Sequence, residues 1–272
     1  MRVLSLLAVG GLSLCGPLAR AEGPLLLEYR FNSDGPRHLP DVGPDKAALI
    51  TKTAENKPLV ATEELGAGVS GAASDRAIDF SSATGMGMGS SGPFARLDDA
   101  DAARIFDGLT SFTVSGWIKA EEVIGNTVEF LHKMGLNEEG FDSGWKVTLV
   151  PKGRLRLFVN DKNIVSERSD WERAGEWVFF AITYDGTLKS DNASFYFGTK
   201  NDPVILSSKQ TMVAGPVKPN DVMLFLSRPD RPFRGLIDNI RIHGAAGGSE
   251  GALSEKQLES IRASDITGKQ TR

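Results

Sequence analysis

The sequence predicts an all-β protein, an antiparallel two-sheet β-sandwich with one short helix near the C-terminus. Short apolar or alternating runs recur along the chain, and turn residues such as Pro151-Lys152-Gly153 and Asp185-Gly186 separate them. The runs neither alternate with helical patterns nor repeat at a fixed period, which argues against α/β and repeat architectures. The expected strands lie at residues 25–31, 77–82, 111–120, 127–135, 145–150, 154–160, 176–186, 194–198, 222–227 and 233–244.

Three of these elements carry the clearest local signals. Residues 145–160 alternate in polarity on both sides of a Pro-Lys-Gly turn, which predicts a hairpin. Residues 177–182 are apolar on both faces, which predicts a central strand that loops or a ligand cover on its outer side. Ser254 stands three residues before Gln257, and this capping box predicts the start of the C-terminal helix.

Between the strands, the composition predicts loops and one further helix. Residues 66–92 are rich in Gly, Ser and Ala around one strand, and residues 198–221 are also loop-like. The acidic stretch 97–108 fits a short solvated helix that begins at Asp98 or Asp99. Calcium binding by these acids is the alternative interpretation.

The N-terminus has the pattern of a secretory signal. Arg2 precedes an apolar run that ends near Cys15 and is too short to span a membrane. Ala19-Arg20-Ala21 then matches the small-x-small pattern of signal peptidase. We expect export to the periplasm, the cell surface or the extracellular space after cleavage near Ala21. The predicted organisation is a signal peptide over 1–21, one domain over 22–266 and a disordered tail over 267–272.

The charge and the cysteine count narrow the possible partners. The net charge is −4 and becomes −6 when Arg2 and Arg20 leave with the signal, so the chain gives no support for a nucleic acid or an anionic membrane as partner. The single cysteine, Cys15, lies in the signal, and we therefore expect no disulfide. We expect no membrane-spanning segment in the mature domain.

Three motifs follow one another in a characteristic order. FTVSGWIK (112–119) resembles a Phe-Thr-Val-Ser-x-Trp-Val strand, and GEWVFFAITYDG (175–186) resembles a Gly-x-Trp-x-x-Val-Ala-x-Thr-Tyr-Asp-Gly strand. GLIDNIRIH with the following ALSEKQLESI resembles a Gly-x-Ile-Asp-x-Val-Arg-Ile-Tyr strand and a terminal helix. Together they resemble the laminin-G-like jelly roll of the concanavalin A-like lectin/glucanase superfamily over most of residues 25–265. The resemblance implies two curved antiparallel sheets, a concave face and loops at one rim.

The sequence departs from the family pattern at two places. FYFGTK (195–200) stands where relatives usually carry Tyr-Val-Asp-Gly, and Asp41-Val42-Gly43 stands where relatives often have Asp-x-Ser-Gly. The opening segment of the domain therefore resembles the family only loosely.

Asp238 is the most unusual residue of the last predicted strand. The alternation in FRGLIDNIRIHG places it on the core-facing side. The other residues of that side are Leu236, Ile240 and Ile242. A buried carboxylate needs partners, which are either backbone N–H groups, a hydroxyl or an arginine, or a structural Ca²⁺ shared with backbone carbonyls and a second acid. Some members of the superfamily bind calcium at such a place, and the resemblance suggests Asp41 as the second acid.

The tryptophans are the candidate ligand-binding residues. An indole ring can stack on a sugar, although packing in the core is the alternative interpretation for each. Trp171 lies between Asp170 and Glu172 in a predicted turn, which favours exposure. We take Trp171 and Trp117 as the candidate sugar-contacting residues.

No catalytic residue is predicted. The resemblance implies that hydrolases of this fold carry two carboxylates along one strand, as Glu-x-Asp-x-Glu, and no such strand occurs here. His38, His132 and His243 are not spaced as zinc ligands, and no Gly-x-Ser-x-Gly nucleophile motif is present.

The sequence therefore predicts an exported, non-catalytic binding domain. Its expected ligand is a carbohydrate or a surface glycoconjugate, bound through rim loops and the concave face. A structural or protein-interaction domain of a cell-surface assembly is the alternative, with a glycan or a surface protein as partner, and a diverged glycoside hydrolase is the third hypothesis.

Overall fold

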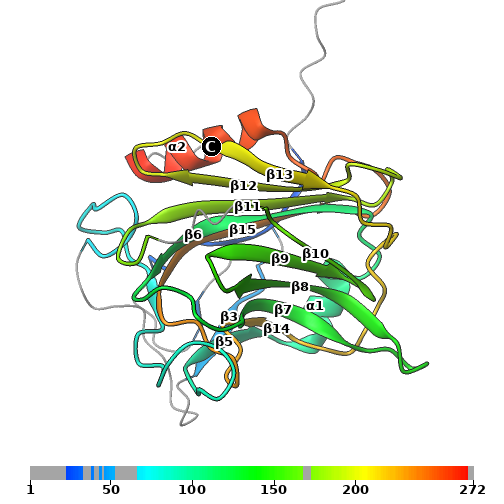
Figure 1. The fold of residues 1–272 in the computed structure, drawn as a ribbon, viewed down its shortest axis with the longest axis horizontal. Helices are drawn as coiled ribbons and strands as arrows, with labels where there is room; N and C mark the ends of the chain where they lie inside the picture. The colour runs from blue at the N-terminus through cyan, green and yellow to red at the C-terminus, as the bar shows by residue number, and fades with distance from the viewer. Residues whose placement is uncertain are drawn as a thin grey trace, which may run out of the picture.

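The computed structural model describes residues 23–32, 38–39, 43–44, 46–52, 66–167 and 173–268. Two antiparallel sheets stack face to face, and helix α2 (Glu255–Thr267) lies against the outer side of one of them (Figure 1). The predicted fold class, a two-sheet antiparallel sandwich with a short C-terminal helix, is confirmed. No helix in the described part of the chain has the length and hydropathy that crossing a membrane requires.

The first sheet has seven strands, in the order β1-β15-β6-β11-β12-β13, with β4 paired to β15. Its strands are β1 (Leu25–Tyr29), β4 (Ile78–Asp79), β6 (Ser111–Ala120), β11 (Val178–Asp185), β12 (Ala193–Thr199), β13 (Ile205–Gln210) and β15 (Gly235–Ala245). Strands β1 and β15 come from opposite ends of the chain, so their pairing closes the domain.

The second sheet has eight strands, in the order β10-β9-β8-β7-β14-β5-β3-β2. Its strands are β2 (His38–Leu39), β3 (Leu49–Lys52), β5 (Phe94–Leu97), β7 (Val128–Leu136), β8 (Asp142–Val150), β9 (Arg154–Val159), β10 (Lys162–Val165) and β14 (Leu224–Leu226). The predicted hairpin over 145–160 is confirmed, because β8 pairs with β9 from Trp145 opposite Val159 to Val150 opposite Arg154.

The core between the sheets follows from the alternation of the strands. Along β9, Leu155, Leu157 and Val159 are buried in the core, while the residues between them point to the outer side. Phe130 and Phe180 meet across the core edge to face, with ring centroids 5.2 Å apart.

A second apolar layer lies under α2. It joins Trp117 and Phe179 of the first sheet to Leu258 of the helix. The prediction that residues 177–182 are covered on both faces is thereby confirmed, and a helix provides the outer cover. The predicted capping box is also present: Ser254 accepts from the N–H of Gln257, and the Gln257 side chain accepts from the N–H of Ser254.

The predicted face of Asp238 is wrong. In β15, Asp238 lies opposite Trp117 and Arg241 lies opposite Ser115, so two residues of β15 face one residue of β6. This β-bulge, at which Asn239 has φ 49°, shifts the alternation by one residue. The core therefore receives Ile237, Ile240 and Ile242, whereas Asp238 points with Trp117 to the side that α2 covers.

Other boundaries differ in detail. Helix α1 (Asp99–Phe106) begins after Asp98, as predicted, but it buries Ala102, Ile105 and Phe106 and is not purely solvated. Strands β2, β3, β5, β10 and β13 were not predicted, because they are short or lie in stretches with loop-like composition. Helix α2 ends at Thr267, with Gly268 as its C-cap residue, so it extends into the predicted tail. Residues 1–22 and 269–272 lie outside the described residues.

Candidate functional site

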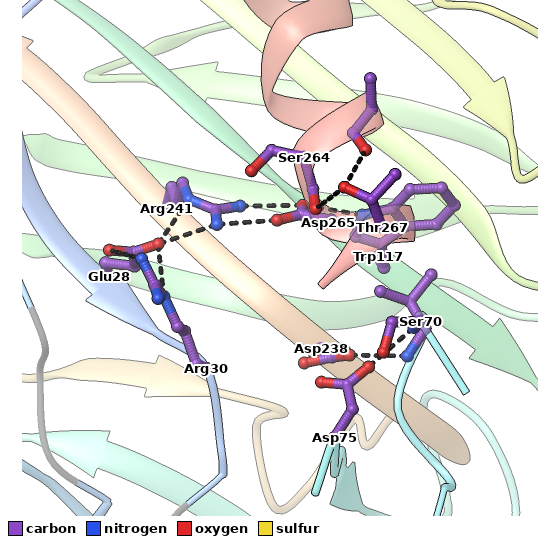
Figure 2. Close-up of polar contacts among 12 residues, drawn as sticks. Glu28, Arg30, Ser70, Asp75, Trp117, Asp238, Arg241, Ser264, Asp265 and Thr267 are labelled. Atoms are coloured by element: carbon purple, nitrogen blue, oxygen red, sulfur yellow. Dashed lines mark hydrogen bonds and ion pairs between the residues drawn. The ribbon is translucent and has the colours of Figure 1, made fainter. Parts of the chain in front are cut away.

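Asp238 is fully buried beneath the loop formed by residues 66–75. Its Oδ2 accepts a hydrogen bond of 2.9 Å from the N–H of Val69, and its Oδ1 accepts none from the described residues. Asp75 lies beside it and accepts from the N–H of Ser70 at 2.7 Å (Figure 2). Burial, and then the charge of Asp75, raise the pKa of Asp238 well above its ordinary value.

A charged network next to Asp238 fixes α2 to the sheet (Figure 2). Arg241 donates two hydrogen bonds, of 2.9 and 2.7 Å, to Asp265 of the helix. It also donates to Glu28 of β1 at 2.8 Å, and Glu28 in turn accepts from Arg30. Burial opposes the charge of Arg241, but the carboxylates of Asp265 and Glu28 raise its pKa above the ordinary value.

Of the two predicted sugar-contacting residues, the structure describes only Trp117, and that residue does not lie on the surface. Trp117 is fully buried, and its Nε1 donates to Asp265 at 2.9 Å, so its ring has no face available for a ligand. Trp171 lies outside the described residues, as does Asp41, the second predicted metal ligand. Among the described residues, no three His, Cys, Asp or Glu side chains form a group that could hold a metal ion.

The outer side of the eight-stranded sheet presents a different set of side chains. We call it the open face and define it by the cross-strand row Arg96, Phe225, His132, Lys146 and Phe158. Each of these residues lies directly opposite the next, on β5, β14, β7, β8 and β9. All but the buried His132 are half-buried, and helix α2 lies on the other sheet (Figure 1). Strand spacing places the two Phe residues about 14 Å apart.

The row brings aromatic rings and cations together. The Phe225 ring contacts the Phe94 ring at 6.0 Å and the His132 ring at 6.5 Å between centroids. The Lys146 Nζ lies 4.5 Å from the centroid of the Phe158 ring. Flat apolar rings beside hydrogen-bond donors are the combination that a carbohydrate platform requires.

Glu129 is the buried anion at the centre of this face. It accepts hydrogen bonds from Lys146 at 3.2 Å, from Arg228 at 2.8 Å and from Arg231 at 2.9 Å. The Nδ1 atom of His132 lies 2.9 Å from its Oε2. Burial opposes ionisation, but His132, Lys146 and Arg228 hold the pKa of Glu129 well below its ordinary value. The carboxylate thus orients the cations that flank the row.

A cavity of about 630 Å³ lies over the same residues. Its lining includes His132, Lys146, Phe158, Phe225 and Arg228. This volume lies within the range of small-ligand sites, about 300–1,000 Å³. The arrangement can bind a ligand through ring faces and charged donors.

The fold and this surface define a jelly-roll β-sandwich with one open sheet face. The laminin-G-type family model described as "Concanavalin A-like lectin/glucanases superfamily" matches residues 95–250. The chain belongs to this family, and the resemblance inferred from the three sequence motifs is confirmed. No curated protein matches the sequence.

Solved structures share the fold at low sequence identity. The binding domain of Paraclostridial Mosquitocidal Protein 1 is 15% identical with a TM-score of 0.59, and the alignment covers 89% of this chain and 52% of that chain. Domain 4 of AbnA, a GH43 extracellular arabinanase from Geobacillus stearothermophilus solved with arabinotriose, is 18% identical with a TM-score of 0.53 and coverages of 89% and 99%.

A third similar structure is that of botulinum neurotoxin type C, whose cell entry is described as dependent upon interaction with two ganglioside molecules. It is 10% identical with a TM-score of 0.55, and the alignment covers 89% of this chain and 51% of that chain. This chain therefore spans about half the length of the two toxin structures and nearly all of the arabinanase domain. At these identities the similarity establishes the fold alone.

Sequence reasoning missed the open face. The alternation of 145–160 indicates that Lys146, Arg154, Arg156 and Phe158 share the side opposite the core leucines. That signal was available, but it does not say whether a helix covers this side. Phe225 lies in the apolar run 222–227, where nothing distinguishes an outward ring from a core ring.

Proposed function

We propose that the protein is an exported, non-catalytic domain that binds carbohydrate across the open face. The observation that carries the proposal is the cross-strand row, in which Phe225 and Phe158 flank His132 and Lys146 beneath the cavity. The arabinotriose complex and the ganglioside-dependent toxin of the same fold support a glycan as ligand. Export rests on the predicted signal over residues 1–21.

The protonation state of Glu129 supports binding without hydrolysis. A glycosidase needs a carboxylic acid with a raised pKa and a second carboxylate at about 5–9.5 Å from it. The pKa of Glu129 is shifted in the opposite direction, and the surrounding cations occupy both of its oxygens. It is therefore suited to hold cations in place and not to donate a proton to a leaving group.

The two rings provide the test of the proposed site. Phe225→Ala and Phe158→Ala are each expected to weaken retention on the bound polysaccharide about tenfold, since loss of a stacked ring costs roughly 1–2 kcal/mol. The measurement is affinity electrophoresis on immobilised arabinan, β-glucan and α-mannan. Val213→Ala is the matched control, because Val213 is an exposed apolar residue that does not line the cavity. Failure of the wild type to bind any polysaccharide would refute the function, and full retention of both variants would refute the site.

Calcium remains a second proposal, for the buried carboxylates beneath residues 66–75. The free Oδ1 of Asp238 and the adjacent carboxylate of Asp75 fit a hard cation in their donor chemistry. Asp238 and Asp75, together with backbone carbonyls, would hold the ion. Its charge would offset the cost of burying two carboxylates.

The calcium proposal predicts a change in thermal stability. Saturating Ca²⁺ is expected to raise the Tm by about 5 °C relative to EDTA, since an ion at a hundred times its Kd stabilises by roughly 2.7 kcal/mol. Scanning fluorimetry measures it, and Asp238→Asn should abolish the shift while Asp101→Asn, an exposed acid of α1, should retain it. Identical melting curves of the wild type in Ca²⁺ and in EDTA would contradict this proposal.

A further inference from the structure

Strand β9 presents two arginines and a ring in line along the open face. Arg154, Arg156 and Phe158 point outward, because Leu155, Leu157 and Val159 between them are buried in the core. Alternate residues of a strand lie about 7 Å apart, so the two guanidinium groups follow one another directly after the Phe158 ring. The Arg156 Cζ lies 5.8 Å from the centroid of that ring.

Neither arginine side chain has a hydrogen-bonding partner or an ion pair among the described residues. The Nε atom of each is buried and donates to no acceptor. On the neighbouring strand, Thr148 lies opposite Arg156, and its hydroxyl also lacks a partner. The described residues therefore leave these donors unsatisfied, and their hydrogen bonds go to solvent or to a ligand that supplies acceptors.

The other cations of the open face differ from these two arginines because they have carboxylate partners. Lys146, Arg228 and Arg231 each pair with the carboxylate of Glu129, and Arg228 also pairs with Asp230. Arg154 and Arg156 have no such counter-charge, although the chain as a whole carries a net charge of −4. Guanidinium groups bind carboxylate and sulfate groups through two parallel hydrogen bonds, so this position favours an anionic ligand.

We propose that Arg154 and Arg156 form an anion subsite that extends the glycan site along β9, so that the ligand is a polysaccharide carrying carboxylate or sulfate groups. The inference rests on the proposed function of the open face. A sugar ring against Phe158 places the charged substituents of the next residues over Arg156 and then Arg154. A repeating anion along a polymer matches two cations in line better than an isolated ion does.

The test compares charged and neutral forms of the same polymer. Polygalacturonate is paired with its fully methyl-esterified form, and dextran sulfate is paired with dextran. The wild type is expected to bind a charged form at least about tenfold more tightly than its neutral partner, since a charge-assisted hydrogen bond contributes roughly that factor. The preference should fall as salt increases. Preference for polygalacturonate identifies the carboxylate as the recognised group, and preference for dextran sulfate identifies the sulfate.

Two double variants separate charge from hydrogen-bond geometry. Arg154→Gln with Arg156→Gln should abolish the preference and leave retention on neutral polysaccharide unchanged, because the rings remain. Arg154→Lys with Arg156→Lys keeps the charge and should retain part of the preference. Both positions are half-buried on the outer side of the sheet, and equal melting temperatures would confirm that the variants fold.

Four outcomes would overturn the inference, and they are distinguishable from one another. Equal affinity for charged and neutral polymers, or a preference that survives the glutamine variant, would remove the anion subsite and leave the proposed function intact. Absence of binding to every polysaccharide would refute both the anion subsite and the proposed function of the open face. Equally tight, arginine-dependent binding of double-stranded DNA would show a general polyanion surface and refute the glycan assignment.

Discussion

Replacing Arg241 by methionine is expected to lower the free energy of unfolding by about 3–5 kcal/mol, the usual cost of removing one partner from a buried ion pair. The guanidinium is nearly inaccessible and joins Glu28 of β1 to Asp265 of α2 through β15. Its removal leaves the buried carboxylate of Asp265 without a cation, while Glu28 keeps only its ion pair with Arg30. It also weakens the attachment of α2 over the second apolar layer, where Trp117 donates to the same Asp265 carboxylate.

Urea denaturation of the wild type and Arg241→Met measures this difference. Arg104→Met is the matched control, because Arg104 pairs with Asp101 on the exposed side of α1 and such pairs contribute at most about 1 kcal/mol. A loss of stability in Arg241→Met no greater than in Arg104→Met would contradict the role assigned to the buried network.

Lys133→Met is expected to destabilise the domain by about 2–3 kcal/mol, because it removes a fully buried ammonium group that donates three hydrogen bonds to Asp107 and Asn220. Lys133 has no exposed surface, although lysine is rarely buried completely. Its Nζ donates to Asp107 at 2.8 Å and to the Oδ1 and backbone oxygen of Asn220 at 2.9 and 3.2 Å. It thereby ties β7 to the end of α1 and to the loop before β14.

The measurement for this second prediction is again the free energy of unfolding, with Lys162→Met as control. Lys162 is exposed and pairs with the exposed Asp161, so its removal should change stability by less than about 0.5 kcal/mol. Similar unfolding curves for Lys133→Met and the wild type would show that the three hydrogen bonds do not contribute as expected.

The architecture could be predicted from the sequence because a strand with one buried face alternates apolar and polar residues, and this pattern identifies both the strand and its core-facing side. The hairpin of β8 and β9 is the clearest case, since its inward leucines and valines are regularly spaced. The failure at Asp238 has a local cause. A bulge at Asn239, packed against Gly116 of β6, adds one residue to β15 and reverses the alternation of inward and outward side chains before it. The amino-acid sequence does not indicate this bulge.

The candidate site was less predictable than the fold. Trp117 is the type of residue that binds sugars, but the helix that buries it lies about 140 residues further along the chain. The open face of the eight-stranded sheet is accessible because α2 covers the seven-stranded sheet instead. Long-range packing decides which face of a sheet remains uncovered, and the residue pattern of a single strand does not predict that packing.

The central claim is that carbohydrate binds on the open face of the eight-stranded sheet. Backbone amide chemical-shift mapping with an oligosaccharide of the most tightly bound polysaccharide tests it directly. We expect the largest changes at His132, Lys146, Phe158 and Phe225, on three consecutive strands and on β14, which is distant in the sequence but lies beside β7 in the sheet. Changes confined to the loop 66–75 and helix α2, on the opposite side of the sandwich, would contradict it.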